Sequence, residues 1–137
     1  MSHPAIRHKL HYGSRVLPCF AERPPSIAAM LRDAVSHSPD ATCIIDGDDA
    51  ITYRALDAGM MVVVGKLAAI GIRQGDRVAV MLANRREFIL AVLACAALGA
   101  ITVPMNIRQR APETEYMLGL CGAVLLIHKA DTACSRL

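Results

Sequence analysis

Residues 59–67, GMMVVVGKL, contain the glycines and lysine of a phosphate-binding loop. Such a loop has four residues between its glycines and a Ser or Thr after the lysine, because backbone N–H groups surround the phosphates and the hydroxyl binds Mg²⁺. Here five residues separate the glycines, and Leu67 replaces the hydroxyl residue. The intervening residues are apolar, so we favour a helix interior over a phosphate site.

Other polar side chains also suggest sites at first sight. Asp46, Asp48 and Asp49 suit a cation, but a solvated hairpin turn is the interpretation we favour. His8 and His11 lie three apart with no third ligand near them in sequence, which favours a solvated tail. No GxGxxG, GxSxG or HExxH motif is present, so we predict no catalytic residue and no metal ligand.

Composition limits the function classes further. The chain has 137 residues, about one domain, and 54% of them are apolar. Part of this apolar material is therefore expected to face a partner or a missing part of the same chain. The net charge of +3 comes from scattered basic residues with few aromatics, which argues against nucleic-acid binding.

Cysteine usage and hydropathy bear on the compartment. The five cysteines are odd in number and form no CxxC pair, so we expect no disulfide framework and no zinc site. The polar residues 1–12 do not resemble a secretory signal, and we predict a cytoplasmic protein. Residues 88–105 lack charge, but Gly99 and Pro104 interrupt them, so we predict a buried helix and strand and no membrane span.

The second half of the chain has the pattern of an α/β protein. Apolar runs at 78–82, 101–103 and 123–127 predict buried strands. Between them we expect a helix capped by Asn84, with Glu87 completing a capping box, and a helix starting near Pro112. This βαβαβ order predicts a parallel sheet with covering helices, because such crossovers are right-handed.

The first half is expected to be less regular. We predict an irregular segment over residues 1–25, a helix capped by Ser26 that ends before Pro39, and a short hairpin over 41–53. A further helix should begin near Tyr53, capped by Thr52, and end before Gly71. Its two glycines and three successive valines disfavour a helix, so tertiary packing must override local preference.

Five short motifs resemble those of adenylate-forming enzymes, in family order and spacing. Residues 52–56 (TYRAL) resemble T-Y-x-x-L, 71–80 (GIRQGDRVAV) resemble G-x-x-x-G-D-x-V, and 84–88 (NRREF) resemble N-x-x-E-F. Residues 98–106 (LGAITVPMN) are similar to x-G-A-x-x-V-P-x-N, and 115–127 (EYMLGLCGAVLLI) continue the match. Residues 26–131 therefore resemble the N-terminal part of an acyl-CoA synthetase.

This resemblance implies a reaction in two halves. A carboxylate attacks the α-phosphate of ATP to give an acyl-adenylate, and coenzyme A then takes the acyl group. The complete enzyme would use ATP, Mg²⁺, CoA and a small-molecule carboxylate. The family's Pro-Lys-Gly loop, adenine segment, ribose-binding Asp and late catalytic Lys are absent from these 137 residues.

We therefore expect residues 26–137 to be a partial AMP-binding domain, truncated before the phosphate-binding loop. On this interpretation the segment is a scaffold, inactive and without a bound cofactor on its own. Its partner would be the remainder of the synthetase or a second copy of itself.

One loop of the chain has a ligand-binding role by resemblance. In CoA-forming members, the loop after V-P-x-N lies near the channel of the CoA nucleotide. Asn106, Arg108 and Arg110 occupy that loop, and guanidinium groups suit phosphates. A solvated loop without a ligand is the alternative.

Two other functions stay open at this point. The chain can be a non-catalytic interaction or dimerisation module related to acyl-CoA synthetases, since unpaired sheet edges invite partners. The segment GDRVAV also occurs in dehydrogenases, although the missing glycine fingerprint argues against a dehydrogenase fragment.

Overall fold

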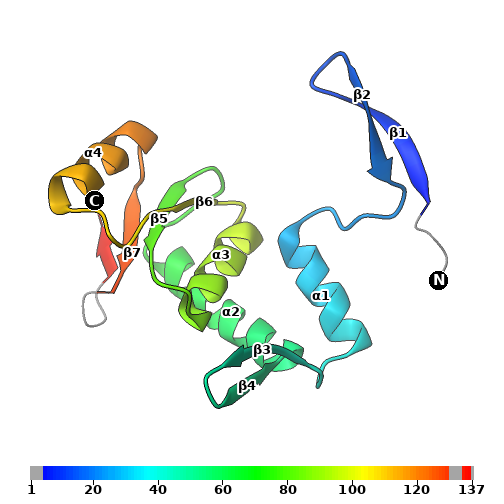
Figure 1. Ribbon diagram of the computed structural model, residues 1–137, viewed down its shortest axis with the longest axis horizontal. Coiled ribbons are helices and arrows are strands. Elements are labelled where there is room, and N and C mark those ends of the chain that lie inside the picture. The colour runs from blue at the N-terminus through cyan, green and yellow to red at the C-terminus, as the bar shows by residue number, and fades with distance from the viewer. Residues whose placement is uncertain (1–4, 130–133, 137) are drawn as a thin grey trace.

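A computed structural model describes residues 5–129 and 134–136. Figure 1 shows an α/β unit around a four-stranded sheet with the order β6-β5-β7-β8. Strands β5 (Arg77–Met81), β6 (Ile101–Pro104) and β7 (Leu125–His128) run parallel, and β8 (Cys134–Arg136) is antiparallel to β7. The predicted βαβαβ sheet is confirmed.

Helices cover both faces of this sheet (Figure 1). Helix α3 (Arg86–Leu98) connects β5 to β6, and α4 (Ala111–Cys121) connects β6 to β7. Helices α1 (Ile27–His37) and α2 (Tyr53–Ala69) precede the sheet in sequence and pack with α3 on one side. Helix α4 lies on the other side. None of the helices described is long and apolar enough to cross a bilayer.

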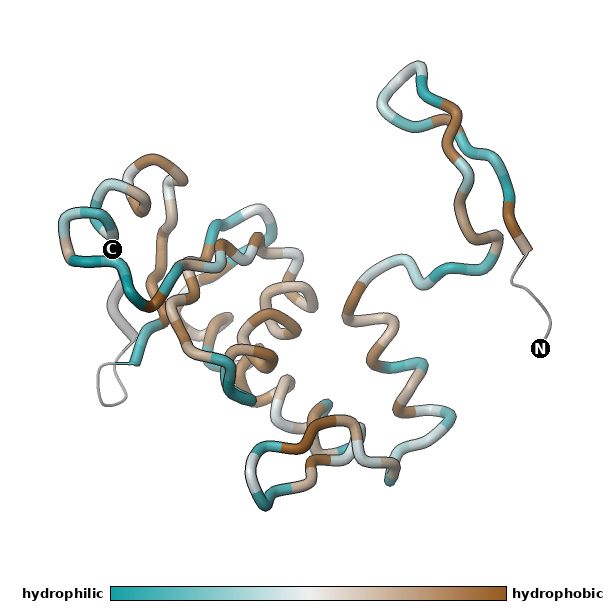
Figure 2. Tube along the Cα trace, in the orientation of Figure 1, coloured by the Kyte–Doolittle hydropathy of each residue, from teal (hydrophilic) through white to brown (hydrophobic). Residues whose placement is uncertain are grey.

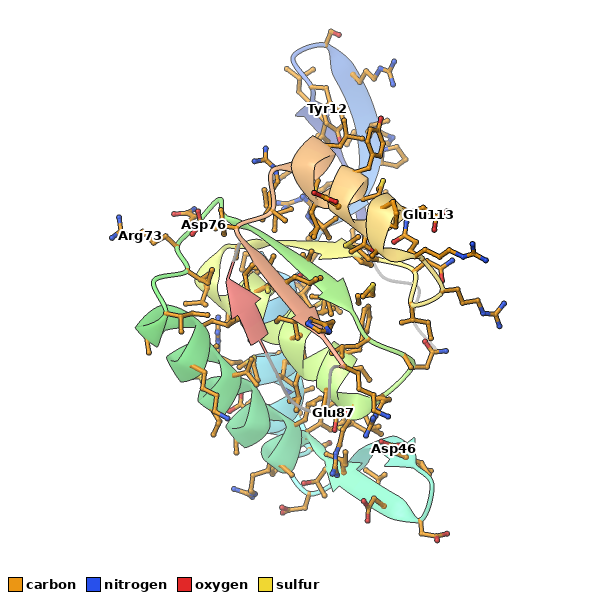
Figure 3. All side chains as sticks on the ribbon, turned by 90° about the vertical axis from the view of Figure 1, so that its left-hand side faces the viewer. Tyr12, Asp46, Arg73, Asp76, Glu87 and Glu113 are labelled. Carbon is orange, nitrogen blue, oxygen red and sulfur yellow. The ribbon has the colours of Figure 1, made fainter. Side chains whose placement is uncertain are left out.

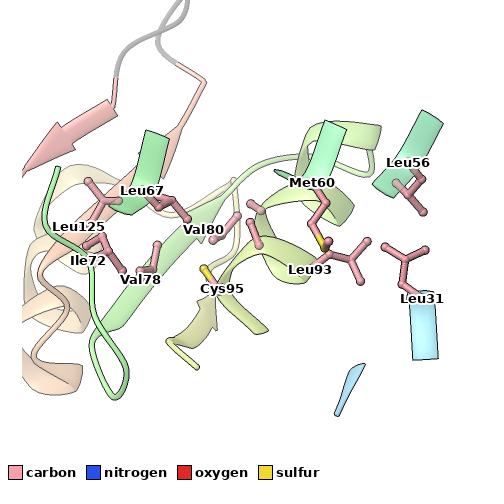
Figure 4. Packing of buried hydrophobic residues seen from close by; sticks show 12 residues of the cluster. Leu31, Leu56, Met60, Leu67, Ile72, Val78, Val80, Leu93, Cys95 and Leu125 are labelled. Atoms are coloured by element: carbon pink, nitrogen blue, oxygen red, sulfur yellow. The ribbon is translucent and has the colours of Figure 1, made fainter. Parts of the chain in front are cut away.

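The alternation of side chains along β5 divides the core between the two faces. Val78 and Val80 point towards α2 and α3, whereas Ala79 points towards α4. All three are fully buried. Figure 4 shows the larger cluster, in which Met60 of α2 lies beside Leu93 of α3, and Cys95 of α3 lies near Val78 and Val80 of the sheet. A strand buried on both faces needs no polar alternation, which explains its continuous apolar sequence.

The first two helices begin at the predicted caps. The hydroxyl of Ser26 accepts the Ala29 N–H at 3.1 Å, and the hydroxyl of Thr52 accepts the Ala55 N–H at 3.2 Å. Helix α2 continues through Gly59 despite the unfavourable propensity of glycine. A Cβ at Gly59 would lie 3.1 Å from Leu90 Cδ2, so glycine here allows α2 and α3 to pack closely.

The predicted cap of α3 is wrong. The helix starts one residue later than expected, with Arg85 at the N-cap and no side-chain cap. Glu87 does not complete a capping box. Its carboxylate lies 3.3 Å from Nε of Arg85 and 3.7 Å from Nε of Arg86. The two neighbouring guanidinium groups thus compete for the carboxylate that the prediction assigned to the backbone.

The expectation of an irregular segment before residue 26 is also wrong. Strands β1 (Ile6–His11) and β2 (Arg15–Phe20) form an antiparallel hairpin, whose turn holds Tyr12 and Gly13 at positive φ. The hairpin stands apart from the α/β unit in Figure 1. His8 and His11 fall on opposite faces of β1, because side chains alternate along a strand. They do not share a metal site.

A second hairpin agrees with prediction. Strands β3 (Thr42–Asp46) and β4 (Asp49–Thr52) pair antiparallel around a turn containing Gly47 and Asp48. The acidic cluster therefore lies in and beside a hairpin turn, as predicted. Asp49 forms an ion pair with Arg86, at 3.5 Å from Oδ2 to Nη1, which links this hairpin to the start of α3.

Adjacent methionines in α2 provide a test of this core. Met60 is 1% exposed and Met61 is 56% exposed. We expect Met60→Ala to lower the free energy of unfolding by about 2–5 kcal/mol, because it leaves a cavity in the core between α2 and α3. Met61→Ala should change it by less than about 0.5 kcal/mol. Urea unfolding followed by circular dichroism measures both, and equal losses would contradict this packing.

Candidate functional site

The carboxyl ends of the parallel strands define the edge where a ligand site is expected. Val80 of β5 is in register with Pro104 of β6, and Met81 is in register with His128 of β7. In open α/β sheets, ligands bind beyond this edge, because loops from neighbouring strands converge there. The loop between β6 and α4 leaves this edge and carries the three residues predicted to contact CoA.

Asn106 shapes that loop. The Met105 N–H donates to Val80 O at 2.9 Å, which fixes the start of the loop to the central strand. The Oδ1 atom of Asn106 then accepts the Arg108 N–H at 2.9 Å, and its carbonyl accepts the Gln109 N–H at 3.1 Å. An Asn side chain that bonds backbone two residues on stabilises a tight turn. Its position in V-P-x-N is thus explained by the local backbone.

Arg110 marks the start of α4. Its backbone N–H donates to Glu113 Oε2 at 2.8 Å, and its carbonyl accepts the Thr114 N–H at 3.0 Å. The guanidinium has no acceptor atom, so the reciprocal bond of a complete capping box is not made. The Glu113 carboxylate also lies at the positive end of the helix dipole. The side chain of Glu113 is labelled in Figure 3.

The two arginines of this loop are exposed. Among residues 5–129, neither Arg108 nor Arg110 takes part in an ion pair. An exposed guanidinium without an internal carboxylate partner retains its five donors for an anion. The structure therefore brings the predicted residues onto one loop, with the two charged groups available and Asn106 bonded within the loop.

Beside this loop lies a hollow that the sequence analysis did not identify. It has a volume of about 810 Å³ and lies against the sheet face on which α4 packs. Residues from β5, α4, β7 and the connecting loops line it, among them Met81, Gln109, Thr114, Leu118 and His128. The Oε1 atom of Gln109 is buried and has no hydrogen-bond partner among the described residues. The one feature of the sequence that pointed to this hollow is that Gln109 lies between Arg108 and Arg110.

The described residues support neither a cysteine nucleophile nor a metal site. Burial raises the pKa of the Cys95 thiol, and a hydrogen bond with Thr102 offsets part of this effect. Burial also raises the pKa of Cys43. Both groups therefore stay protonated at neutral pH, which disfavours a role as nucleophile. Over the described residues, no three His, Cys, Asp or Glu side chains gather closely enough to hold a metal ion.

The family model of AMP-binding enzymes matches residues 31–137. The chain belongs to the AMP-binding enzyme family. A feruloyl-CoA synthase from Amycolatopsis is 38% identical over 96 residues, which cover 70% of this chain and 20% of that protein. The chain thus spans about a fifth of the length of this synthase and of the similar curated CoA ligases.

Solved structures place the same unit in AMP-binding enzymes. The N-terminal domain of FACL13 from Mycobacterium tuberculosis has a TM-score of 0.74 and 34% identity, covering 79% of this chain and 28% of that domain. The O-succinylbenzoate CoA synthetase MenE from Bacillus subtilis has a TM-score of 0.71 and 29% identity, covering 75% of this chain and 23% of that protein. The predicted family and fold are confirmed. The roles of Asn106, Arg108 and Arg110 stay predictions.

The bond between Glu113 and the Arg110 amide predicts how the loop is held. We expect Glu113→Ala to lower the free energy of unfolding by about 0.5–1 kcal/mol, because it removes the acceptor at the start of α4. Glu113→Gln should retain most of the stability. Glu115→Ala, in the same turn and also exposed, is the matched control. Urea unfolding distinguishes them, and a larger loss in the Glu115 variant would contradict the assignment.

Proposed function

We propose that this chain is the scaffold part of an ATP-dependent acyl-CoA ligase. The complete enzyme would activate a small carboxylic acid as its adenylate and pass the acyl group to CoA. The observation that carries this proposal is the family match over residues 31–137 in a sequence that contains no Pro-Lys-Gly loop. The partial AMP-binding domain would begin near residue 26, at the cap of α1.

Physical chemistry supports inactivity of the chain by itself. Adenylate formation places charge on phosphoryl oxygens, which must be met by preorganised N–H groups, a lysine and Mg²⁺. The hollow beside α4 is lined mainly by apolar side chains, and its only basic side chain is that of His128. ATP, Mg²⁺ and CoA therefore belong to the complete enzyme in this proposal, and the free thiols of Cys43 and Cys95 are in keeping with a cytoplasmic location.

A related proposal is that the chain serves as an interaction module. Strand β6 lies at the edge of the sheet and has a neighbour only in β5 among the described strands. Its first residue, Ile101, is largely exposed. An open edge of this kind can pair with the remainder of a synthetase or with a second copy. In both the scaffold proposal and the interaction-module proposal the chain has a structural role, and the two proposals differ in the partner that it binds.

Pyrophosphate exchange tests the scaffold proposal directly. We expect the 137-residue chain to show no carboxylate-dependent exchange of labelled pyrophosphate into ATP with ferulate, fatty acids or 2-succinylbenzoate. The reason is that it lacks the groups that stabilise charge on the transferred phosphate. A full-length feruloyl-CoA synthase assayed alongside is the positive control. Exchange above the no-enzyme background would contradict the proposal.

The loop arginines give a separate test in a chimera. Residues 31–137 would replace the matching segment of a feruloyl-CoA synthase, and Arg108→Ala and Arg110→Ala would be made in it. We expect each to raise the KM for CoA by about tenfold, because a charged hydrogen bond to phosphate is lost. Pyrophosphate exchange should be unchanged, since that half-reaction does not use CoA.

Arg73→Ala is the matched control for the chimera. Arg73 is exposed in the turn before β5, at the opposite edge of the sheet, and is labelled with Asp76 in Figure 3. It should leave the KM for CoA unchanged. An unchanged KM in both loop variants would show that the loop is merely solvated.

A further inference from the structure

The β1–β2 hairpin has one apolar face and one basic face. In the strand register Ile6 pairs with Phe20 and Leu10 with Val16, which places these four side chains on one face, with the pair of His8 and Pro18 between them. Each of the four is more than half exposed. The opposite face carries the pairs Arg7 with Cys19, Lys9 with Leu17, and His11 with Arg15. Figure 2 shows that both strands contain hydrophobic and hydrophilic residues.

The net positive charge of the chain is located in this segment. Strands β1 and β2 contain Arg7, Lys9 and Arg15 and no acidic residue. With Arg23 and Glu22 included, residues 1–23 account for the entire formal net charge of +3. The rest of the chain has equal numbers of basic and acidic residues. A local cationic field of this kind attracts a polyanionic surface.

The AMP-binding unit does not account for this hairpin. The family match begins at residue 31, beyond both strands. In Figure 1 the hairpin projects away from the sheet and its helices, joined to them through the segment before α1. Tyr12 at its tip is 87% exposed. An exposed apolar face, cations on the opposite face and an aromatic side chain at the tip are the features of an amphipathic segment that lies in the interface of a bilayer.

We propose that the β1–β2 hairpin docks on an anionic phospholipid surface. The side chains of Ile6, Leu10, Val16 and Phe20 enter the boundary between headgroups and acyl chains. The long side chains of Arg7, Lys9 and Arg15 start from the other face and reach past the edges of the narrow hairpin to lipid phosphates. This docking does not depend on the proposed ligase activity, because the hairpin lies outside the residues that carry the family match.

Charge and apolar area together favour this occupant over a second copy of the chain or a nucleic acid. A second copy stacked on the apolar face would cover Leu10 and Phe20 but would leave the cations on the two outer faces without a counter-charge. A nucleic acid would neutralise the cations but would leave the apolar face in water. A lipid surface with negative headgroups satisfies both faces of the same hairpin.

Vesicle co-sedimentation of the full 137-residue chain tests the proposal. We expect binding to equimolar phosphatidylglycerol and phosphatidylcholine vesicles, little binding to pure phosphatidylcholine, and weaker binding at high salt, because the attraction is screened. Arg7→Gln/Lys9→Gln/Arg15→Gln should lower the partition coefficient by about a hundredfold, since each cation contributes about fivefold. Leu10→Asp/Phe20→Asp should abolish sedimentation.

Two control variants match the change in charge and in polarity. Arg32→Gln/Lys66→Gln/Arg73→Gln removes three exposed cations outside the hairpin, and Ile45→Asp/Met61→Asp places two carboxylates on exposed apolar positions elsewhere. Both should reduce the partition coefficient by less than about threefold, since these groups lie off the docking face. Circular dichroism spectra of all variants should overlay, because every substituted side chain lies outside the buried core.

Three results would overturn the proposal. One is sedimentation with phosphatidylcholine alone to the same extent. Another is loss of binding in the control variants equal to that in the hairpin variants. The third is that the unsubstituted chain does not sediment with anionic vesicles. A dimer that Leu10→Asp/Phe20→Asp converts to a monomer would then identify a second copy as the occupant, and binding to an added RNA would identify a nucleic acid.

Discussion

Burial of β5 on both faces is the constraint on which the α/β unit depends. Val78, Ala79 and Val80 are all fully buried, and β5 is hydrogen-bonded to β6 on one side and β7 on the other. Such a strand cannot be stable with one face in water, so helices are needed on both sides of the sheet. Helices α2 and α3 meet this need on one face and α4 on the other. The arrangement also fixes the edge at which the connecting loops emerge.

The helices cover the two faces of the sheet unequally, and the hollow lies on the less covered face. The face of Val78 and Val80 is covered by α2 and α3, with α1 packed against both helices. The face of Ala79 has only α4, and the cluster there is much smaller. An apolar hollow remains beside α4, close to the loop that holds Arg108 and Arg110. An AMP-binding enzyme built from this unit would have its open sheet face and its exposed cations on neighbouring surfaces.

The sequence predicted elements whose signals are local. Continuous apolar runs predicted β5 and β7, and the hydroxyls of Ser26 and Thr52 predicted the starts of α1 and α2. The β1–β2 hairpin was missed because Pro18 interrupts the second run and Tyr12 takes a left-handed conformation that glycine usually occupies. The cap of α3 was missed because two adjacent guanidinium groups compete for Glu87. The loop of Asn106 was placed correctly, but the hollow beside it combines residues from β5, α4 and β7, which no local pattern reveals.

The strand order has a consequence for synthesis on the ribosome. Strand β5 is made before both of its neighbours, because β6 and β7 follow it in the chain and lie on either side of it in the sheet. Until Leu125–His128 have emerged, one edge of this buried central strand has no partner. At about 5–20 residues per second this interval lasts several seconds. During that time the nascent chain presents an unpaired hydrophobic strand, which makes it a natural client for a chaperone bound near the exit tunnel.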